Sequence, residues 1–378
     1  MESKKNGNPA KLVAFFLVVT VLIAAIAFSA SGWQGDTLGK PDSGNSDADE
    51  DESESGDADE NKDGEGNGEE TPVTPAPPIY THYVSGLEIS KEESLLKPLC
   101  IVFDTEAPMY GISSSFLTVE IPTENGETRL LAFSNDATSV GKLGSIAPTR
   151  KYISNIAGYF GAVLVCAGED DKFEYSGVNN LDACIDFTHE SGYHYTEYGR
   201  YSYTNEALLN AYIKNNGIST VRDTDIRIPY VFKNESPEGK ANSSEGIAAD
   251  TVLISFDKGS TTELFFSDSD GKYRMKKNSS YVTDRLNDKE LLYDNVFILY
   301  GDSITHETME ATQLIFDTVS GGVGYYAFGG NAVKINWTTN ESGEMIFTDE
   351  AGEVLAVNPG TSYIAFAKAS QMSNTKLS

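Results

Sequence analysis

Charged side chains that flank predicted strands and turns are the residues of this sequence best suited to bind a polar ligand. The candidate set comprises Asp104, Glu120, Glu124, Arg129, Arg150, Arg200 and Tyr203. Asp104 follows a short apolar run and Arg150 enters a predicted helix, at positions where open α/β sheets form ligand crevices. Carboxylates that face guanidinium groups can bind a ligand with both acidic and basic groups, such as a peptide stem or an amino sugar. The same residues can instead form a structural network of salt bridges.

Glu120 and Glu124 also allow a catalytic hypothesis, because glycoside hydrolysis uses two carboxyl groups at a fixed separation. Residues four apart on a strand lie on one face, although a predicted hairpin turn begins at Glu124. We therefore keep a cell-wall hydrolase as the alternative, and we predict binding without catalysis.

Five tyrosines crowd one short segment beside Arg200: Tyr193, Tyr195, Tyr198, Tyr201 and Tyr203. Tyrosine combines an apolar ring with a hydrogen-bonding tip, so this cluster suits contacts with a sugar or a protein. Core packing explains such a cluster equally well.

Two motifs resemble metal sites but lack the spacing that metals require. His189 and His194 are five residues apart, whereas a zinc-binding helix places its two histidines one turn apart. Residues 267–271 contain only a fragment of a calcium loop, and a hairpin turn explains them better. No phosphate-binding loop or serine-nucleophile elbow occurs. We predict no metal and no cofactor.

Three cysteines are an odd number, which argues against a disulfide framework. Cys100 and Cys166 lie in apolar, strand-like runs and are expected to be small core residues. A bridge between Cys166 and Cys184 remains open, because nothing in the spacing demands it.

The apolar segment Leu12–Ala30 is predicted to place this chain at a membrane. As a helix it would be roughly 28 Å long, close to the thickness of the hydrocarbon core of a bilayer. Lysines precede it and acidic residues follow it, so residues 1–11 are expected in the cytoplasm and the bulk of the chain outside. A cleaved signal peptide is the competing interpretation, because small residues end the segment.

The net charge of −29 is concentrated in part after this segment, since residues 41–70 hold fourteen acidic residues and one lysine. We predict that residues 31–80 form a disordered acidic and proline-rich linker, serving as a tether or, alternatively, as a calcium-binding or docking tail. Because the remaining sequence is also acidic, nucleic acid is not an expected partner.

Two domains are predicted after the linker, and the fold class is α+β. Residues 81–235 show a mixed α/β pattern, with strands at 99–103, 116–121, 128–133 and 162–165 and helices at 148–158 and 206–215. A polar stretch follows. Residues 247–369 contain short apolar runs separated by turn residues, which is typical of an antiparallel β domain.

Several short motifs lie in these two regions. The first region contains Phe103-Asp104-Thr105, Val119-Glu120-Ile121-Pro122 and the turn Glu124-Asn125-Gly126-Glu127-Thr128-Arg129, and the second contains Gly321-Gly322-Val323-Gly324, Trp337, Phe347-Thr348-Asp349 with Gly352, and Asn358-Pro359-Gly360-Thr361. On these motifs, residues 83–368 resemble the YerB-like family of bacterial extracytoplasmic proteins. Members are usually lipoproteins with paired N- and C-terminal domains and no assigned activity.

The chain also departs from the pattern of this family. An arginine of the Gly-Pro-Val-Arg-Ser-x-Arg motif is missing in 144–150, although Arg150 remains. Two histidines of the family are replaced, at Cys166 and within 202–205. No cysteine for a lipid anchor lies near the end of the apolar segment. The resemblance therefore implies a divergent member that is anchored by a transmembrane helix and binds peptidoglycan or another envelope protein.

Overall fold

The fold, a computed structural model, describes residues 78–168, 184–188, 191–222, 226–233, 246–257, 259–307 and 312–378. These residues belong to one compact unit, Thr74–Ser378. The predicted membrane span 12–30 and nearly all of the predicted linker lie outside the described residues. Within the described ranges, no helix is long and apolar enough to cross a membrane.

A 14-stranded sheet forms the centre of this unit. Its strands from the first predicted domain are β3 (Leu99–Asp104), β4 (Leu117–Pro122), β5 (Thr128–Ser134), β6 (Leu143–Ile146), β7 (Val163–Cys166), β8 (Cys184–Asp186), β9 (Tyr195–Glu197) and β10 (Tyr201–Thr204). Those from the second are β12 (Ile247–Ala248), β18 (Asn295–Gly301), β21 (Gly322–Phe328), β22 (Asn331–Thr339), β23 (Met345–Thr348) and β25 (Ser362–Lys368). Strand β25 pairs in parallel with β4, so a single sheet runs through both predicted domains.

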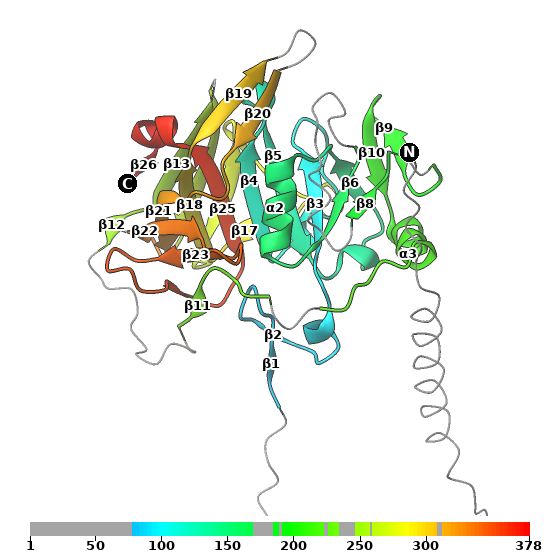
Figure 1. Ribbon diagram of the computed structural model, residues 1–378, viewed down its shortest axis with the longest axis horizontal. Helices are drawn as coiled ribbons and strands as arrows, with labels where there is room; N and C mark the ends of the chain where they lie inside the picture. The colour runs from blue at the N-terminus through cyan, green and yellow to red at the C-terminus, as the bar shows by residue number, and fades with distance from the viewer. Residues whose placement is uncertain are drawn as a thin grey trace, which may run out of the picture. The chain divides into compact units, whose positions relative to one another are not determined.

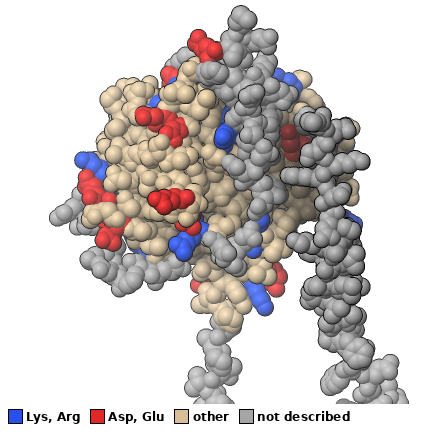
Figure 2. All heavy atoms as spheres, viewed as in Figure 1, with Lys and Arg blue, Asp and Glu red and all other residues tan. Residues whose placement is uncertain are grey.

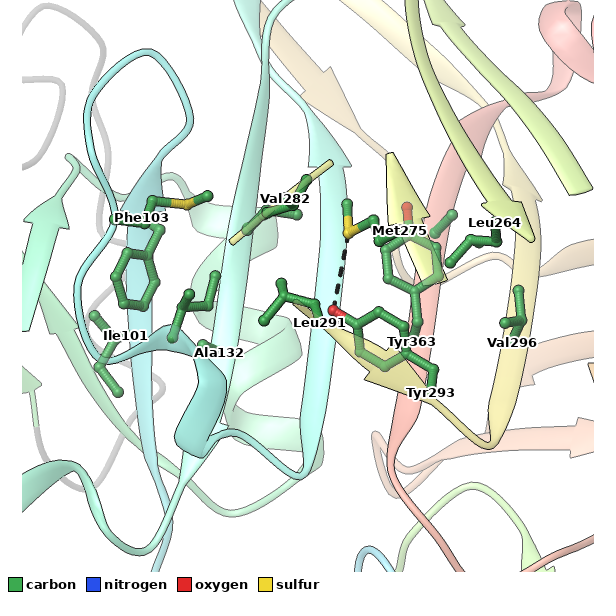
Figure 3. Packing of buried hydrophobic residues seen from close by; sticks show 14 of the residues in the cluster. Ile101, Phe103, Ala132, Leu264, Met275, Val282, Leu291, Tyr293, Val296 and Tyr363 are labelled. Atoms are coloured by element: carbon green, nitrogen blue, oxygen red, sulfur yellow. Dashed lines mark hydrogen bonds between the residues drawn. The ribbon is translucent and has the colours of Figure 1, made fainter. Parts of the chain in front are cut away.

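A six-stranded sheet packs on one face of the central sheet. It contains β13 (Thr251–Asp257), β14 (Ser260–Ser267), β15 (Lys272–Lys277), β16 (Ser280–Tyr281), β17 (Leu292–Tyr293) and β26 (Lys376–Leu377). Alternate residues of β13 are buried, as expected for a strand with one face on a core. Figure 3 shows the side chains that fill the space between the sheets, including Met275 and Tyr293 from the smaller sheet and Tyr363 from β25.

Two α-helices occur among the described residues (Figure 1), and their buried residues belong to the two different core clusters of the unit. Helix α2 (Lys151–Tyr159) buries Ile153 and Ile156 in the cluster on the face opposite the six-stranded sheet. Helix α3 (Glu206–Asn215) buries Leu209 in the other cluster, and Asn205 caps its N-terminus by accepting a hydrogen bond from the backbone N–H of Leu208. Both predicted helices are therefore present.

Three short pairs of strands lie outside the two main sheets: β1 (Tyr80–Thr81) with β2 (Glu88–Ile89), β11 (Val231–Phe232) with β24 (Ala356–Val357), and β19 (Ser303–Glu307) with β20 (Thr312–Phe316). The β19–β20 hairpin projects from the body of the unit in Figure 1. Strands thus dominate both halves of the described chain. The β-rich second half follows the prediction, and the first half contains more strand than its mixed α/β pattern suggested.

His82, between β1 and β2, gives the fold a dependence on pH. Its Nδ1 accepts hydrogen bonds from the backbone N–H groups of Val84 and Ser85, and its ring packs on Phe116. Burial, together with the charge of Arg222, lowers the pKa of His82 to about 4. A neutral imidazole is therefore part of the native structure.

We expect the free energy of unfolding to fall by about 2 kcal/mol between about pH 7 and 5, because the unfolded chain binds a proton at His82 that the folded chain excludes. This stability is present above the unfolded pKa of 6.5 and is lost as pH falls toward the folded value of about 4. Urea unfolding at several pH values measures it. His82→Asn, which keeps an acceptor near Nδ1, should flatten the dependence; an unchanged slope would contradict the assignment.

Candidate functional site

Glu120 is the most deeply buried charged residue of the predicted set, with no exposed surface. Its Oε1 accepts hydrogen bonds from Thr128 Oγ1 at 2.6 Å and from Lys277 Nζ at 2.5 Å. Its Oε2 accepts from Thr262 Oγ1 at 2.7 Å and from the Tyr363 hydroxyl at 2.5 Å. Three of the four donors come from the second half of the chain, so this carboxylate joins the two halves.

The surroundings of Glu120 keep its carboxyl group ionised. Burial alone would raise its pKa, but the ammonium of Lys277 and the hydrogen bonds from Lys277, Thr128 and Tyr363 outweigh burial and lower the pKa below its ordinary value. A carboxylate that is fully buried and fully engaged cannot reach a ligand in this structure. The prediction that Glu120 belongs to an accessible site therefore conflicts with its burial.

A second buried carboxylate, Asp284, also joins the halves. It belongs to the second half and accepts hydrogen bonds from Gly111 and Ser113 in the first half. Its Oδ1 accepts hydrogen bonds from the backbone N–H groups of Gly111 and Leu286, at 2.9 and 2.8 Å. Its Oδ2 accepts from the backbone N–H and the hydroxyl of Ser113, at 2.9 and 2.7 Å. The sequence did not single out Asp284, because its partners in the first half are more than 170 residues away.

Glu124, in the turn between β4 and β5, forms a bidentate ion pair with Arg150, the N-cap residue of α2. Arg150 Nε donates to Oε1 at 3.1 Å and Nη2 to Oε2 at 3.0 Å, and both side chains are mostly buried. The backbone N–H of Leu314 on β20 also donates to Glu124, at 3.2 Å. Although burial raises the pKa of Glu124, these contacts lower it overall. Through Leu314, the middle residue of β20, the pair holds the β19–β20 hairpin against the turn that follows β4.

Asp104 and Arg129 pair at the same end of these strands, where Arg129 near the start of β5 lies opposite Asp104, the last residue of β3. Arg129 Nη2 lies 3.5 Å from Asp104 Oδ2, and Nη1 lies 3.4 Å from Glu127 Oε2. Arg200 is exposed, and its guanidinium donates to the Tyr201 hydroxyl at 3.3 Å. The predicted charged set thus divides into the Glu124–Arg150 pair, the Asp104–Arg129 pair, the buried Glu120 and the exposed Arg200.

The tyrosine segment surrounds a cation that belongs to the chain itself. Tyr203 is buried, and its hydroxyl donates to the backbone carbonyl of Pro108 at 3.0 Å. Lys142 Nζ lies 2.6 Å from a carboxylate oxygen of Glu197. The same nitrogen lies over three rings, at 4.0, 4.7 and 5.9 Å from the centroids of Tyr110, Tyr203 and Tyr198. These cation–π contacts attach the β9–β10 hairpin to the unit.

The two motifs that resemble metal sites are only partly within the described residues. Among the described residues, no group of three His, Cys, Asp or Glu side chains could hold a metal ion. His189 lies outside the described residues. Residues 267–271 form the turn between β14 and β15, where Asp270 pairs with Arg274.

Two adjacent pockets lie where the six-stranded sheet meets the first half of the chain. Their volumes are about 370 and 200 Å³, and both are lined by Thr105, Glu106, Lys277 and Asn278. The larger pocket extends along 280–285 to Tyr281 and Arg285, and the smaller extends along 126–128 to Glu127. We call the two together the junction groove.

Charged groups of both signs line the junction groove. Lys277 lines both pockets, and its ammonium also binds the buried Glu120. Glu106 and Arg285 are exposed, and neither side chain is paired with any residue of the described ranges. Sequence reasoning missed this site, since its segments are distant in the chain. The one available signal was the basic pattern of strand 272–277 in an acidic protein.

Comparisons with known proteins agree with this arrangement of two halves. Residues 84–226 match the family described as the N-terminal domain of the DUF3048 proteins of unknown function, and residues 252–364 match the corresponding C-terminal domain. No curated protein sequence matches the chain. Among solved structures, it is similar to the crystal structure of the YerB protein from Bacillus subtilis. The TM-score is 0.66 at 16% identity, covering 79% of this chain and 99% of that one.

Proposed function

Because this chain belongs to the DUF3048 family of two-domain, YerB-like proteins, to which no function is assigned, we propose its role from its own residues. It acts as an envelope protein that is anchored by Leu12–Ala30 and binds a polar ligand, without catalysis, in the junction groove. The ligand is cell-wall material or an exposed segment of another envelope protein.

The observation that supports binding is that charged groups of both signs line one groove. Arg285 offers a cationic donor and Glu106 a carboxylate, and Lys277 and Glu127 add charges that already pair with Glu120 and Arg129. Tyr281, which is nearly half exposed, adds an aromatic face suited to a sugar ring or an apolar side chain. A peptide stem or an amino sugar carries the complementary groups. On the face seen in Figure 2 the described surface carries both signs and no broad basic patch for a polyanion.

Catalysis by Glu120 and Glu124 receives no support from their surroundings. A glycosidase needs one carboxylic acid with a raised pKa that can donate a proton. The pKa values of both residues are instead lowered, and their oxygens are occupied by donors. We therefore place the hydrolase alternative behind binding.

The location rests on the apolar segment Leu12–Ala30 and the lysines before it. Protease added to spheroplasts is expected to remove the folded unit, and detergent to be required for extraction of the remaining stump. Release of the folded unit into the medium of untreated cells would show cleavage after the segment and contradict the anchor.

The binding proposal predicts that the full chain binds soluble peptidoglycan fragments and that Arg285→Ala weakens this binding by about tenfold or more, since a hydrogen bond to a charged group is worth about 1.5–3 kcal/mol. Titration calorimetry measures both. The fold should persist, because the backbone N–H of Arg285, rather than its side chain, bonds Met109.

Arg227→Ala is the matched control. Arg227 is an exposed arginine that does not line the groove, and its side chain is 80% exposed. Equal affinities of the two variants would remove the groove as the binding site. Failure of the unaltered chain to bind any fragment would exclude peptidoglycan as the ligand.

A further inference from the structure

Two cysteines lie side by side in the central sheet, although 18 residues separate them in the chain. Cys166 is the last residue of β7 and Cys184 the first residue of β8, and these strands pair in parallel. Their Sγ atoms are 3.9 Å apart. All three cysteines of the chain are free thiols. The distance between the two Sγ atoms therefore makes Cys166 and Cys184 the pair of thiols closest to forming a disulfide among the described residues.

We propose that Cys166 and Cys184 are a redox-active dithiol, which an external disulfide converts to an intramolecular Cys166–Cys184 disulfide in the folded protein. An S–S bond is about 2.0 Å long, so the sulfurs have to approach each other by roughly 1.9 Å. Rotation of both side chains about their Cα–Cβ bonds supplies part of this approach. Diagonal neighbours on paired strands have Cα atoms about 7–8 Å apart, beyond the usual disulfide range of about 4.4–6.8 Å, so the backbone at Cys184 also has to move toward β7.

The register of the two strands sets how this approach has to occur. Leu164, two residues before Cys166, is the residue opposite Cys184. The two thiols are therefore diagonal neighbours on one face of the sheet. Cys184 is the first residue of β8, and within the described ranges the ladder with β7 holds it on its C-terminal side. The pair can close at this end of β8 while the pairs of Val165 with Ile185 and of Cys166 with Asp186 remain.

The two thiols differ in accessibility, and this difference sets the order of reaction. Cys184 is partly exposed, whereas Cys166 is buried. The hydrogen bond to Cys184 and burial raise the pKa of the Cys166 thiol well above its ordinary value. Cys184 therefore reacts first with an oxidant, and Cys166 serves as the resolving thiol.

The reaction is two successive thiol–disulfide exchanges. The Cys184 thiol loses its proton and its sulfur attacks one sulfur of an external disulfide, which releases the first thiol of the oxidant. The Cys166 thiol then loses its proton and attacks Cys184 Sγ in the mixed disulfide, which releases the second thiol. The protein loses two electrons and two protons, and the external disulfide gains them.

The test treats the reduced full chain with oxidised glutathione under native conditions, followed by acid quenching and mass spectrometry of the intact protein and its peptides. We expect a mass lower by about 2 Da, from the two hydrogens lost, and a cross-linked peptide pair that contains Cys166 and Cys184. Cys100, which is fully buried on β3, should remain a free thiol.

Single substitutions separate the two steps. Cys166→Ser should stop the reaction at a glutathione adduct on Cys184, and Cys184→Ser should leave Cys166 unmodified. A persistent glutathione adduct on Cys184 in the unaltered chain, a bridge that involves Cys100, or three unmodified thiols would each overturn the proposal. Circular dichroism of the oxidised chain has to match that of the reduced chain, because the bridge is proposed for the folded state.

Discussion

Lys277→Met is expected to lower the free energy of unfolding by about 3–5 kcal/mol, because removal of one partner leaves a buried charge uncompensated. Glu120 has no exposed surface, and Lys277 is its only cationic partner among the described residues. The methionine keeps most of the apolar stem of the lysine, so the loss reports mainly on the ammonium. Urea unfolding of the purified protein measures it.

Lys276→Met is the matched control, because Lys276 is the adjacent residue of β15 and its ammonium lies over the rings of Phe265 and Tyr281. Its substitution should change stability by no more than about 1 kcal/mol. Adding Glu120→Gln to Lys277→Met should recover part of the loss, since the pair is then neutral. Equal effects of the two lysine substitutions would show that the Lys277–Glu120 pair does not join the halves.

The Lys277–Glu120 pair also predicts the direction of a pH dependence. The pKa of Glu120 is lowered in the folded state, so its contribution is present above the unfolded value of 4.5 and is lost as pH falls through the folded value. The decline in stability on the acid side should therefore be shallower in the Lys277→Met protein, in which the stabilised carboxylate has lost its ammonium.

Asp284→Ala is the second large effect, with an expected loss of about 3–5 kcal/mol, because several buried donors lose a charged acceptor at once. The donors are the backbone N–H groups of Gly111 and Leu286 and both donor groups of Ser113. Asp284→Asn should cost less, since the amide retains one acceptor oxygen. Differential scanning calorimetry should still show one transition if the two halves unfold together.

Asp268→Ala provides the control for Asp284→Ala, because Asp268 is an exposed aspartate in the turn between β14 and β15. We expect a change within about 0.5 kcal/mol there. If Asp284→Ala instead separates unfolding into two transitions, the halves are independently stable and Asp284 only holds them together. A variant as stable as the control would contradict the joining role.

Local patterns in the sequence predicted most of the individual elements. The strands β3, β4, β5 and β7 and both helices lie within a few residues of the predicted segments, because apolar periodicity, Asn-Gly turns and caps act over short distances. Short strands without such a pattern, such as β6, β8 and β9, were missed. Strand β15 was also missed. Four of its six residues are basic, and only Tyr273 and Met275 face the core, so its sequence has a polar pattern.

The candidate site was predicted less well, because the partner of each charged residue depends on contacts between distant parts of the chain. The sequence predicted a ligand site and left a network of salt bridges as the alternative, and the structure contains the Glu124–Arg150 and Asp104–Arg129 pairs. It did not place Glu120 beside Lys277, which is 157 residues later in the chain. No local pattern carries information about a contact at that separation.

The sequence by itself determined the family, the β-rich character of the second half and the positions of most strands and helices, since these depend on short motifs and on local periodicity. The tertiary structure alone decided that one sheet runs through both halves, that Glu120 and Asp284 are buried as joining carboxylates, and that Lys277 and Arg285 line a common groove. The physical reason is that burial and charge pairing depend on which distant strands become neighbours, and that choice is made by cooperative packing of the whole unit.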